Sequence, residues 1–267
     1  MIIAGYIFSI LMGVVLGTLG AGGSILILPI LVYFMGINPS LATAYSLIIV
    51  AFTALVGSIK YITNKQMNLV VLSIFAVPSV ITIYITRRYL LPAFPESLYL
   101  GQIIITKDFL IMLIFSLLML SASYLMLFSK EIISSTSSNK LYANSKIILN
   151  GSLVGFFTGI IGAGGGFLIV PALVIFSGLN MKTAVGTSLF IIFIKSMIGF
   201  FGDVQAGVQI NYYLIIMITI CTSIGILIGV KYSKNISGNA LKKTFGYFLI
   251  LISLFIIIKE IMINFTI

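Results

Sequence analysis

Long apolar runs separated by short polar stretches dominate the pattern of this chain. The runs cover residues 2–35, 42–59, 69–86, 109–128, 147–177, 184–202, 212–230 and 244–263. About 20 apolar residues in a helix suffice to cross the hydrocarbon core of a bilayer, so most runs predict one spanning helix each. The predicted fold class is an all-α polytopic membrane protein with about 8 transmembrane helices.

The first and fifth runs are too long for a single span, and each contains a cluster of glycines. The stretch after the first cluster, 25–34, would be only about 15 Å long as a helix, whereas the hydrocarbon core is about 30 Å thick. We therefore expect a broken or re-entrant helix in each half of the chain.

The two glycine clusters belong to an internal repeat. Residues 13–57 and 155–199 align at a constant offset of 142 without a gap, with 19 identities in 45 positions. A glycine-broken hydrophobic segment in both halves is typical of transporters whose binding site lies between two repeats. We predict a first transmembrane repeat at 1–128, a polar linker at 129–146 and a second transmembrane repeat at 147–267, with four apolar segments in each repeat.

Composition agrees with a lipid environment. The chain is 60% hydrophobic and 7% charged, with a mean hydropathy of +1.25, whereas a soluble domain carries roughly a quarter charged residues. Fifteen basic and five acidic residues give a net charge of +10, which we attribute to basic loops near anionic lipid and not to a nucleic-acid partner. We expect a multi-pass protein of a bacterial inner membrane, whose N-terminal run is the first span and not a cleaved signal peptide.

The basic residues determine the orientation only weakly. If each run crosses the membrane once, eight basic residues lie in loops on one side and six on the other. The positive-inside rule then slightly favours both termini outside. In the same scheme the stretch 92–107 is an interfacial loop.

The glycine clusters differ from the small-residue pairs at which membrane helices usually pack. Gly13 with Gly17 and Gly225 with Gly229 show the packing spacing of four. The clusters instead place three or four glycines within five residues, and each glycine weakens a helix by about 1 kcal/mol relative to alanine. Such backbone is tolerated at membrane depth where it is buried in protein or lines a wet cavity.

A helix is expected to resume directly after each glycine cluster. Its free N–H groups and the positive end of its dipole favour an anion. We predict that the two helix ends face each other near the midplane and form an anion site, with a hinge or packing role as the alternative. The predicted ligands are Gly20, Ala21, Gly22, Gly23 and Ser24 in the first repeat and Gly162, Gly164, Gly165 and Gly166 in the second.

Lys195 is a charged residue in the middle of the sixth run. An ammonium at that depth costs about 2.5–3.5 kcal/mol on insertion, and ionisable residues there are functional by default. Its partner in the first repeat is Thr53, so only one repeat carries the charge. We predict that Lys195 binds the anion or supplies its field; the alternative is a structural contact with backbone carbonyls or Asp203.

Hydroxyl groups on the same run extend the predicted site. Thr187 and Ser188 can share a helix face with Lys195, and Tyr45 and Ser46 occupy the equivalent places in the first repeat. We predict that Ser46, Thr187 and Ser188 donate hydrogen bonds to the substrate and that Tyr45 also belongs to the binding site.

The residues that are missing exclude several function classes. The chain has no histidine, and its acids, Glu96, Asp108, Glu131, Asp203 and Glu260, all lie away from the middle of the runs. A proton relay, a metal site and a Ser/His/Asp triad therefore lack their residues. We expect no enzyme activity, no catalytic residue, no metal site, no cofactor and no nucleic-acid partner.

Three motifs relate the chain to a known family. They are the doubled Gly-Ala-Gly-Gly break followed by an apolar run and proline (20–29 and 162–171), the stretch 184–189, and the stretch 206–209. With these motifs the chain resembles the TauE/SafE family of sulfite exporters over nearly its whole length. The resemblance implies movement of small sulfur-containing anions such as sulfite, thiosulfate or organosulfonates. The first repeat has Ala44-Tyr45 where the second has Gly186-Thr187, so the second repeat should match the family site better.

The leading hypothesis is an exporter or permease that moves such anions by alternating access around a central backbone site. One alternative is a non-transporting membrane anchor or partner subunit that docks through the linker 129–146, and another is a passive anion channel. The expected partners are a small anionic sulfur substrate and the lipid bilayer, and a homodimer is left open.

Overall fold

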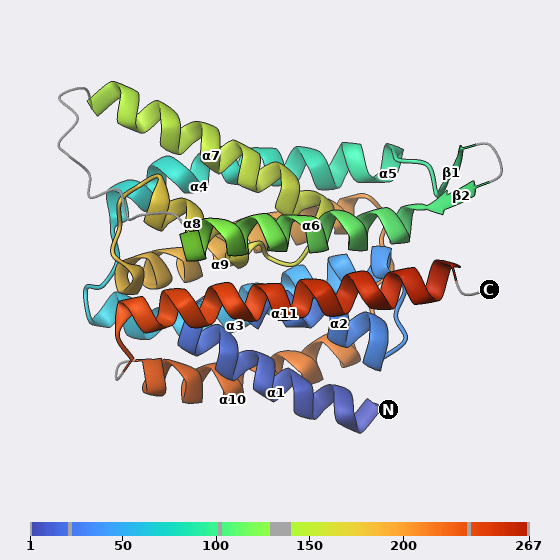
Figure 1. The fold of residues 1–267 in the computed structure, drawn as a ribbon, viewed down its shortest axis with the longest axis horizontal. Helices are drawn as coiled ribbons and strands as arrows, with labels where there is room; N and C mark the ends of the chain where they lie inside the picture. The colour runs from blue at the N-terminus through green and yellow to red at the C-terminus, as the bar shows by residue number, and fades with distance from the viewer. Residues whose placement is uncertain (1, 21–22, 101–102, 129–139, 234–235, 266–267) are drawn as a thin grey trace.

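The structure is a bundle of helices, seen in a computed structural model that describes residues 2–20, 23–100, 103–128, 140–233 and 236–265 (Figure 1). The helices are α1 (Ile2–Leu19), α2 (Gly23–Pro29), α3 (Pro39–Thr63), α4 (Leu69–Ile85), α5 (Leu91–Ala93), α6 (Lys107–Phe128), α7 (Lys140–Ile161), α8 (Gly166–Ile175), α9 (Met181–Gln205), α10 (Tyr212–Ser233) and α11 (Gly238–Phe265). Two π-helical turns, η1 (Ile30–Phe34) and η2 (Thr86–Leu90), continue α2 and α4. An antiparallel pair of strands, β1 (Ser97–Leu100) and β2 (Ile103–Thr106), precedes α6.

The predicted fold class is confirmed. Within the described residues, six helices are long and apolar enough to cross a membrane, namely 39–63, 69–93, 107–128, 181–205, 212–233 and 238–263. Shorter apolar helices at 4–19, 24–34, 145–161 and 166–175 accompany them. The long helices run roughly along one axis of the molecule (Figure 1), as spans of one membrane must. The protein is an all-α polytopic membrane protein, and the number of repeats stays a prediction.

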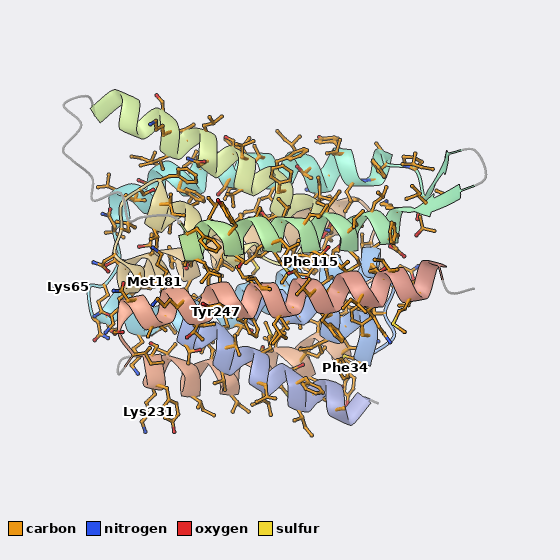
Figure 2. All side chains as sticks on the ribbon, in the orientation of Figure 1. Phe34, Lys65, Phe115, Met181, Lys231 and Tyr247 are labelled. Carbon is orange, nitrogen blue, oxygen red and sulfur yellow. The ribbon has the colours of Figure 1, made fainter. Side chains whose placement is uncertain are left out.

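Both long runs are broken at their glycines, as predicted. α1 ends at Leu19 and α2 begins at Gly23, while α7 ends at Ile161 and α8 begins at Gly166. The chain then turns back: α2 and η1 lead to Phe34 at the end of the bundle where α1 begins, and α8 leads back towards Met181 at the end where α7 begins (Figures 1 and 2). The short helices are therefore re-entrant.

These reversals correct the loop assignment that followed from eight full crossings, because a re-entrant segment returns the chain to its starting side. Lys65, Met181 and Lys231 lie at the same end of the bundle (Figure 2). Among the described side chains, this lysine-rich end carries Lys60, Lys65, Lys146, Lys182, Lys231, Lys242 and Lys243 at the ends of its helices. The opposite, acid-containing end carries Arg87, Arg88, Lys107 and Lys259 together with Glu96, Asp108, Asp203 and Glu260.

The helices pack in pairs, and each pair combines one helix from each half of the sequence. α1 packs against α10 and α4 against α7, while α3 contacts α9 and α6 contacts α11. α1 and α7, which are equivalent in the aligned repeat, run in opposite directions along the bundle, and so do α6 and α11 (Figure 1). This arrangement supports two inverted repeats that interlock.

Glycines allow the interlocking pair α1–α10 to approach closely, as their spacing predicts. A Cβ atom on Gly13 would lie 2.9 Å from the Cα atom of Gly225, and one on Gly17 would lie 2.9 Å from the Cα atom of Gly229. Side chains at these positions would push the two helices apart, so the packing interpretation of these glycines holds.

Three boundaries differ from the sequence prediction. The third run does not close at Arg87, because the helix continues through η2 and α5 to Ala93 with the apolar residues that follow the arginines. The interfacial stretch 92–107 contains the hairpin of β1 and β2 in addition to loop. α7 begins at Lys140, inside the predicted linker, and residues 129–139 of that linker lie outside the described residues.

The separation of charges predicts the orientation of the protein. Because cytoplasmic loops are enriched in Lys and Arg, the lysine-rich end should face the cytoplasm and both termini should lie outside. Alkaline phosphatase fused to the C-terminus in a bacterial host should be active, and green fluorescent protein fused there should be dark. The same reporters inserted after Lys65 should give the opposite result. A fluorescent C-terminal fusion would contradict this orientation.

Candidate functional site

The second glycine break adopts a backbone that only glycine adopts easily. Gly162, Gly164 and Gly165 have φ angles of +74°, +63° and +68°, in the left-handed region. Gly165 caps the N-terminus of α8, whose first residue is Gly166. The first N–H groups of a helix have no acceptor within it. In α8 the N–H of Leu168 donates to the carbonyl of Gly165, so the donors at this end are the N–H groups that precede it, together with the positive end of the α8 dipole.

Each glycine break is bound by a serine of the other repeat. Ser46 on α3 donates a hydrogen bond to the carbonyl of Gly162 at 2.5 Å, and its equivalent on α9, Ser188, donates to the carbonyl of Gly20 at 3.4 Å. Gly20 also has a left-handed φ, of +75°. Both serines are completely buried. They therefore fix the breaks, and their predicted contact with substrate stays a prediction.

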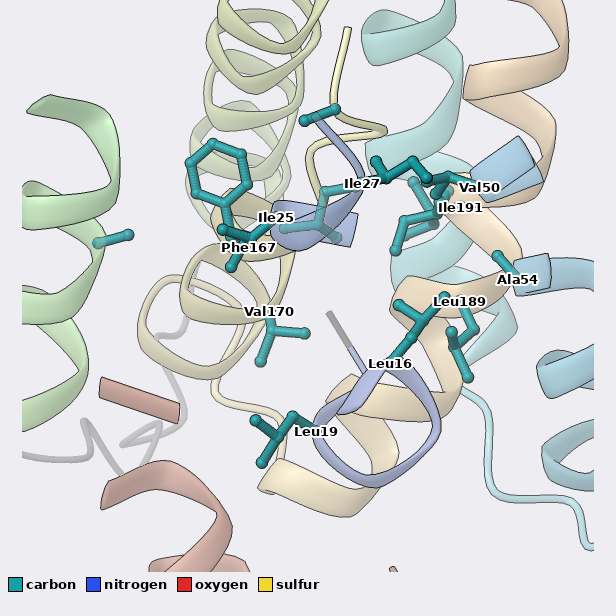
Figure 3. Close-up of a cluster of buried hydrophobic side chains, with 14 of the residues drawn as sticks. Leu16, Leu19, Ile25, Ile27, Val50, Ala54, Phe167, Val170, Leu189 and Ile191 are labelled. Carbon is teal, nitrogen blue, oxygen red and sulfur yellow. The ribbon is translucent and has the colours of Figure 1, made fainter. Parts of the chain in front are cut away.

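The two short helices meet in the core of the protein, as predicted for the two breaks. Ile25 of α2 and Phe167 of α8 belong to one buried apolar cluster with Val50 of α3 and Leu189 of α9 (Figure 3). Gly23 begins α2 and Ser24 is fully buried, while the predicted ligands Ala21 and Gly22 lie outside the described residues. The side chains of this cluster are apolar, so polar contacts to a substrate must come from the glycine turns and their neighbours.

Lys195 lies beside the second break. It is 0% exposed, and its Nζ donates a hydrogen bond to Thr158 Oγ1 at 2.7 Å. A Cβ atom on Gly165 would lie 2.8 Å from Nζ, so the ammonium packs directly against the left-handed turn. Within the described part of the chain no carboxylate pairs with Nζ. A hydroxyl does not neutralise an ammonium, so the positive charge faces the start of α8 without a counter-charge.

The alternative in which Asp203 pairs with Lys195 is wrong. Asp203 Oδ2 instead forms an ion pair with Arg87 Nη1 at 3.3 Å. Both side chains are buried, and Arg87 also donates to Thr43 Oγ1 at 3.0 Å. Asp203 therefore pairs with Arg87 at the acid-containing end of the bundle and not with Lys195.

Two of the predicted hydroxyl ligands hold loops in this structure. The Tyr45 hydroxyl accepts a hydrogen bond from the backbone N–H of Asn211 at 2.9 Å, and Thr187 Oγ1 accepts one from the backbone N–H of Asn68 at 3.1 Å. These contacts are equivalent in the two repeats and fix the loops before α10 and α4. Thr187 thus bonds to a different element from Lys195, and the substrate role of Tyr45 and Thr187 stays a prediction.

Sequence reasoning missed Thr158 and Arg87. Thr158 directly precedes Gly159 on α7. A buried ammonium needs a hydrogen-bond acceptor such as its hydroxyl. Arg87 directly follows the predicted run 69–86, but the apolar residues after it extend the helix, and Arg87 is only 1% exposed. The apolar continuation to residue 91 was the available signal for its burial.

A cavity opens from the lysine-rich end towards the first break. Its volume is about 430 Å³, and its lining includes Lys60, Lys182, Asn64 and Gln66. Val185 also lines this cavity, and its side chain packs directly on Gly20: a Cβ atom added to Gly20 would collide with it. Two lysines at the mouth of a cleft attract anions, so this cavity is suited to anion entry.

Comparison with known proteins identifies the family. The family model described as sulfite exporter TauE/SafE matches residues 6–256. The chain belongs to the TauE/SafE family. It is similar to the probable membrane transporter protein YunE of Bacillus subtilis, with 28% identity over 76% of this chain and 79% of that protein. A probable membrane transporter protein of Xylella fastidiosa strain 9a5c is also 28% identical, over 92% of this chain and 91% of the relative. No solved structure matches the chain.

Membership of the TauE/SafE family establishes the general function. The protein is a multi-pass membrane transporter and not an enzyme. Its apolar outer surface, with large hydrophobic side chains such as Leu69, Leu227 and Leu251 exposed by more than half, contacts the lipid bilayer.

The contact between Thr158 and Lys195 predicts a coupling in stability. Thr158→Val should destabilise the protein by about 1–3 kcal/mol, because it leaves a buried ammonium without its acceptor. In a Lys195→Met background the same substitution should cost much less. Thermal unfolding of the purified protein in detergent measures both effects. Thr219→Val is the matched control, since the Thr219 hydroxyl bonds to the carbonyl of Ile215 in its own helix. Equal costs of Thr158→Val in both backgrounds would show that the two side chains are not coupled.

Proposed function

We propose that the protein transports small sulfur-containing anions, such as sulfite, thiosulfate or organosulfonates, by alternating access around the second glycine break. The observation that carries this proposal is the buried Lys195 ammonium, which packs on Gly165 and has no acid partner in the described part of the chain. A compact anion with several oxygens suits both the ammonium and the backbone N–H groups at the start of α8.

The arrangement of the two breaks supports a carrier mechanism. Each re-entrant helix is held by a serine of the other repeat, and α1 and α7 are interlocked with α10 and α4. A movement of one repeat against the other would therefore change the serine contacts of both breaks at once, and it would expose the centre first to one end and then to the other.

The site should favour the second repeat. Lys195 and Thr158 are replaced in the first repeat by Thr53 and Leu16, neither of which carries a charge. Thr53 donates a hydrogen bond to the carbonyl of Ile49 and forms another with Thr222 at 2.6 Å. The first break thus lacks the field that would hold an anion, and the substrate should bind closer to α8 than to α2.

Flux measurements in proteoliposomes test the proposal. The wild-type protein should take up sulfite or a small organosulfonate with a rate that saturates, and Lys195→Met should reduce the uptake at least about tenfold, because it removes the buried charge that attracts the anion. Lys231→Met, which removes a lysine at the lysine-rich end of α10, is the matched control and should stay close to wild type.

Two results would count against the proposal. Lys195→Met transporting as fast as wild type would remove Lys195 from the site. Flux that rises in proportion to concentration at millimolar substrate would indicate a passive channel in place of a carrier.

A further inference from the structure

The acid-containing end of the bundle holds a buried arginine whose hydrogen bonds are incomplete. Arg87 uses only Nη1, which contacts the two carboxylate oxygens of Asp203 at 3.3 and 3.4 Å and Thr43 Oγ1 at 3.0 Å. Charge-assisted N–H···O hydrogen bonds are normally about 2.7–2.9 Å long. The ion pair is therefore a loose one, although the Arg87 and Asp203 residues are only 1% and 3% exposed.

Part of the Arg87 guanidinium lies against the second glycine break. Nε and Nη2 are buried without a hydrogen-bond partner. A Cβ atom on Gly162 would collide with Nη2, so Nη2 packs directly on this glycine of the break. A buried N–H group without an acceptor costs free energy, and a guanidinium binds two oxygens of one anion in a planar fork. The acceptor that Arg87 lacks is what a multi-oxygen anion would supply.

The internal repeat relates this region to the open cavity at the other end. Ser40, Arg87 and Asp203 line a cavity of about 140 Å³ at the acid-containing end. At offsets of 142 or 143 along the aligned sequence, their equivalents are Lys182, Val230 and Tyr61. All three of those equivalents line the cavity of about 430 Å³ at the lysine-rich end. The two cavities therefore occupy equivalent places in the two repeats, and the ion pair lines the smaller one.

We propose that Arg87 is a ligand of the transported anion and that the Arg87–Asp203 ion pair closes the smaller cavity, at the acid-containing end, until the anion replaces Asp203. An anion at Gly162 would engage Nε and Nη2 and weaken the hold of Nη1 on the carboxylate. Asp203 lines the smaller cavity, so water can hydrate its carboxylate once this cavity opens. This inference rests on the proposed anion transport and adds a second cation, Arg87, to the site formed by Lys195.

Labelling of introduced cysteines tests the closure without measuring transport. The natural Cys221 is replaced by alanine in every protein, and the full chain is studied in detergent, where a charged maleimide reaches both ends. Ala44→Cys reports on the smaller cavity and Val185→Cys on the larger one; both native residues line their cavities and are 1% exposed. Val185→Cys should react quickly and Ala44→Cys slowly.

Breaking the ion pair should open the smaller cavity. Asp203→Asn should raise the labelling rate of Ala44→Cys by about tenfold and leave that of Val185→Cys unchanged, in line with the size of typical couplings between two states. The double variant Arg87→Gln/Asp203→Asn removes both charges and leaves neither one buried and unpaired, which guards against misfolding. Its Ala44→Cys should be labelled as fast as that of Asp203→Asn. Unchanged labelling of Ala44→Cys in both variants would overturn the closure, whatever the substrate is.

Addition of an anion tests the ligand role of Arg87. With sulfoacetate as the probe and chloride at equal ionic strength as the control, the labelling of Ala44→Cys should rise in the otherwise wild-type protein and not change further in the double variant. Calorimetry should show sulfoacetate binding at least about tenfold more weakly to Arg87→Gln than to wild type.

The outcomes separate this inference from the proposed function. Unchanged affinity in Arg87→Gln would overturn the ligand role while leaving anion transport through Lys195 intact. If neither sulfoacetate, sulfite nor thiosulfate binds the wild-type protein, the proposed substrate class fails together with the ligand role of Arg87.

Discussion

An ammonium buried in the centre of a membrane protein, with no acid beside it among the residues that the structure describes, is the constraint on which the rest of this structure depends. Lys195 is held by a hydroxyl of α7 and packs on a glycine of the break that follows it. Such a charge is tolerated because left-handed glycines bring the backbone close and because the surrounding helices exclude lipid. A site with a buried lysine, helix N–H groups and, among the described residues, no neighbouring carboxylate is organised for an anion.

The two halves of the chain build this site together. Ser46 of the first half fixes the break of the second, Ser188 of the second fixes the break of the first, and the outer helices exchange partners in the same way. Because the equivalent helices run in opposite directions, a contact or cavity at one end of the bundle has its counterpart at the other end. The counterparts are not identical: the cavity beside Lys182 at the lysine-rich end has a volume of about 430 Å³, whereas the cavity lined by the Arg87–Asp203 ion pair has a volume of about 140 Å³.

The sequence predicts the fold class, the broken helices and the burial of Lys195, because length and hydropathy control insertion and because glycine clusters are costly in a helix. It does not predict which polar groups meet. Thr158 and Lys195 are 37 residues apart, and Arg87 and Asp203 are 116 residues apart, so their contacts depend on the packing of α7, η2 and α9. The loop assignment failed because it counted each apolar run as one crossing, whereas the first and fifth runs each contain a re-entrant helix that returns the chain to its starting side.

The most direct test of an anion site at the second break is a cryo-electron microscopy structure of the full chain with thiosulfate, whose sulfur atoms give strong density. The account predicts density within hydrogen-bond distance of Lys195 Nζ and of the backbone N–H groups at Gly165 and Gly166. Density confined to the lysine-rich cavity, with Lys195 still bound to Thr158 and no ligand beside α8, would contradict it.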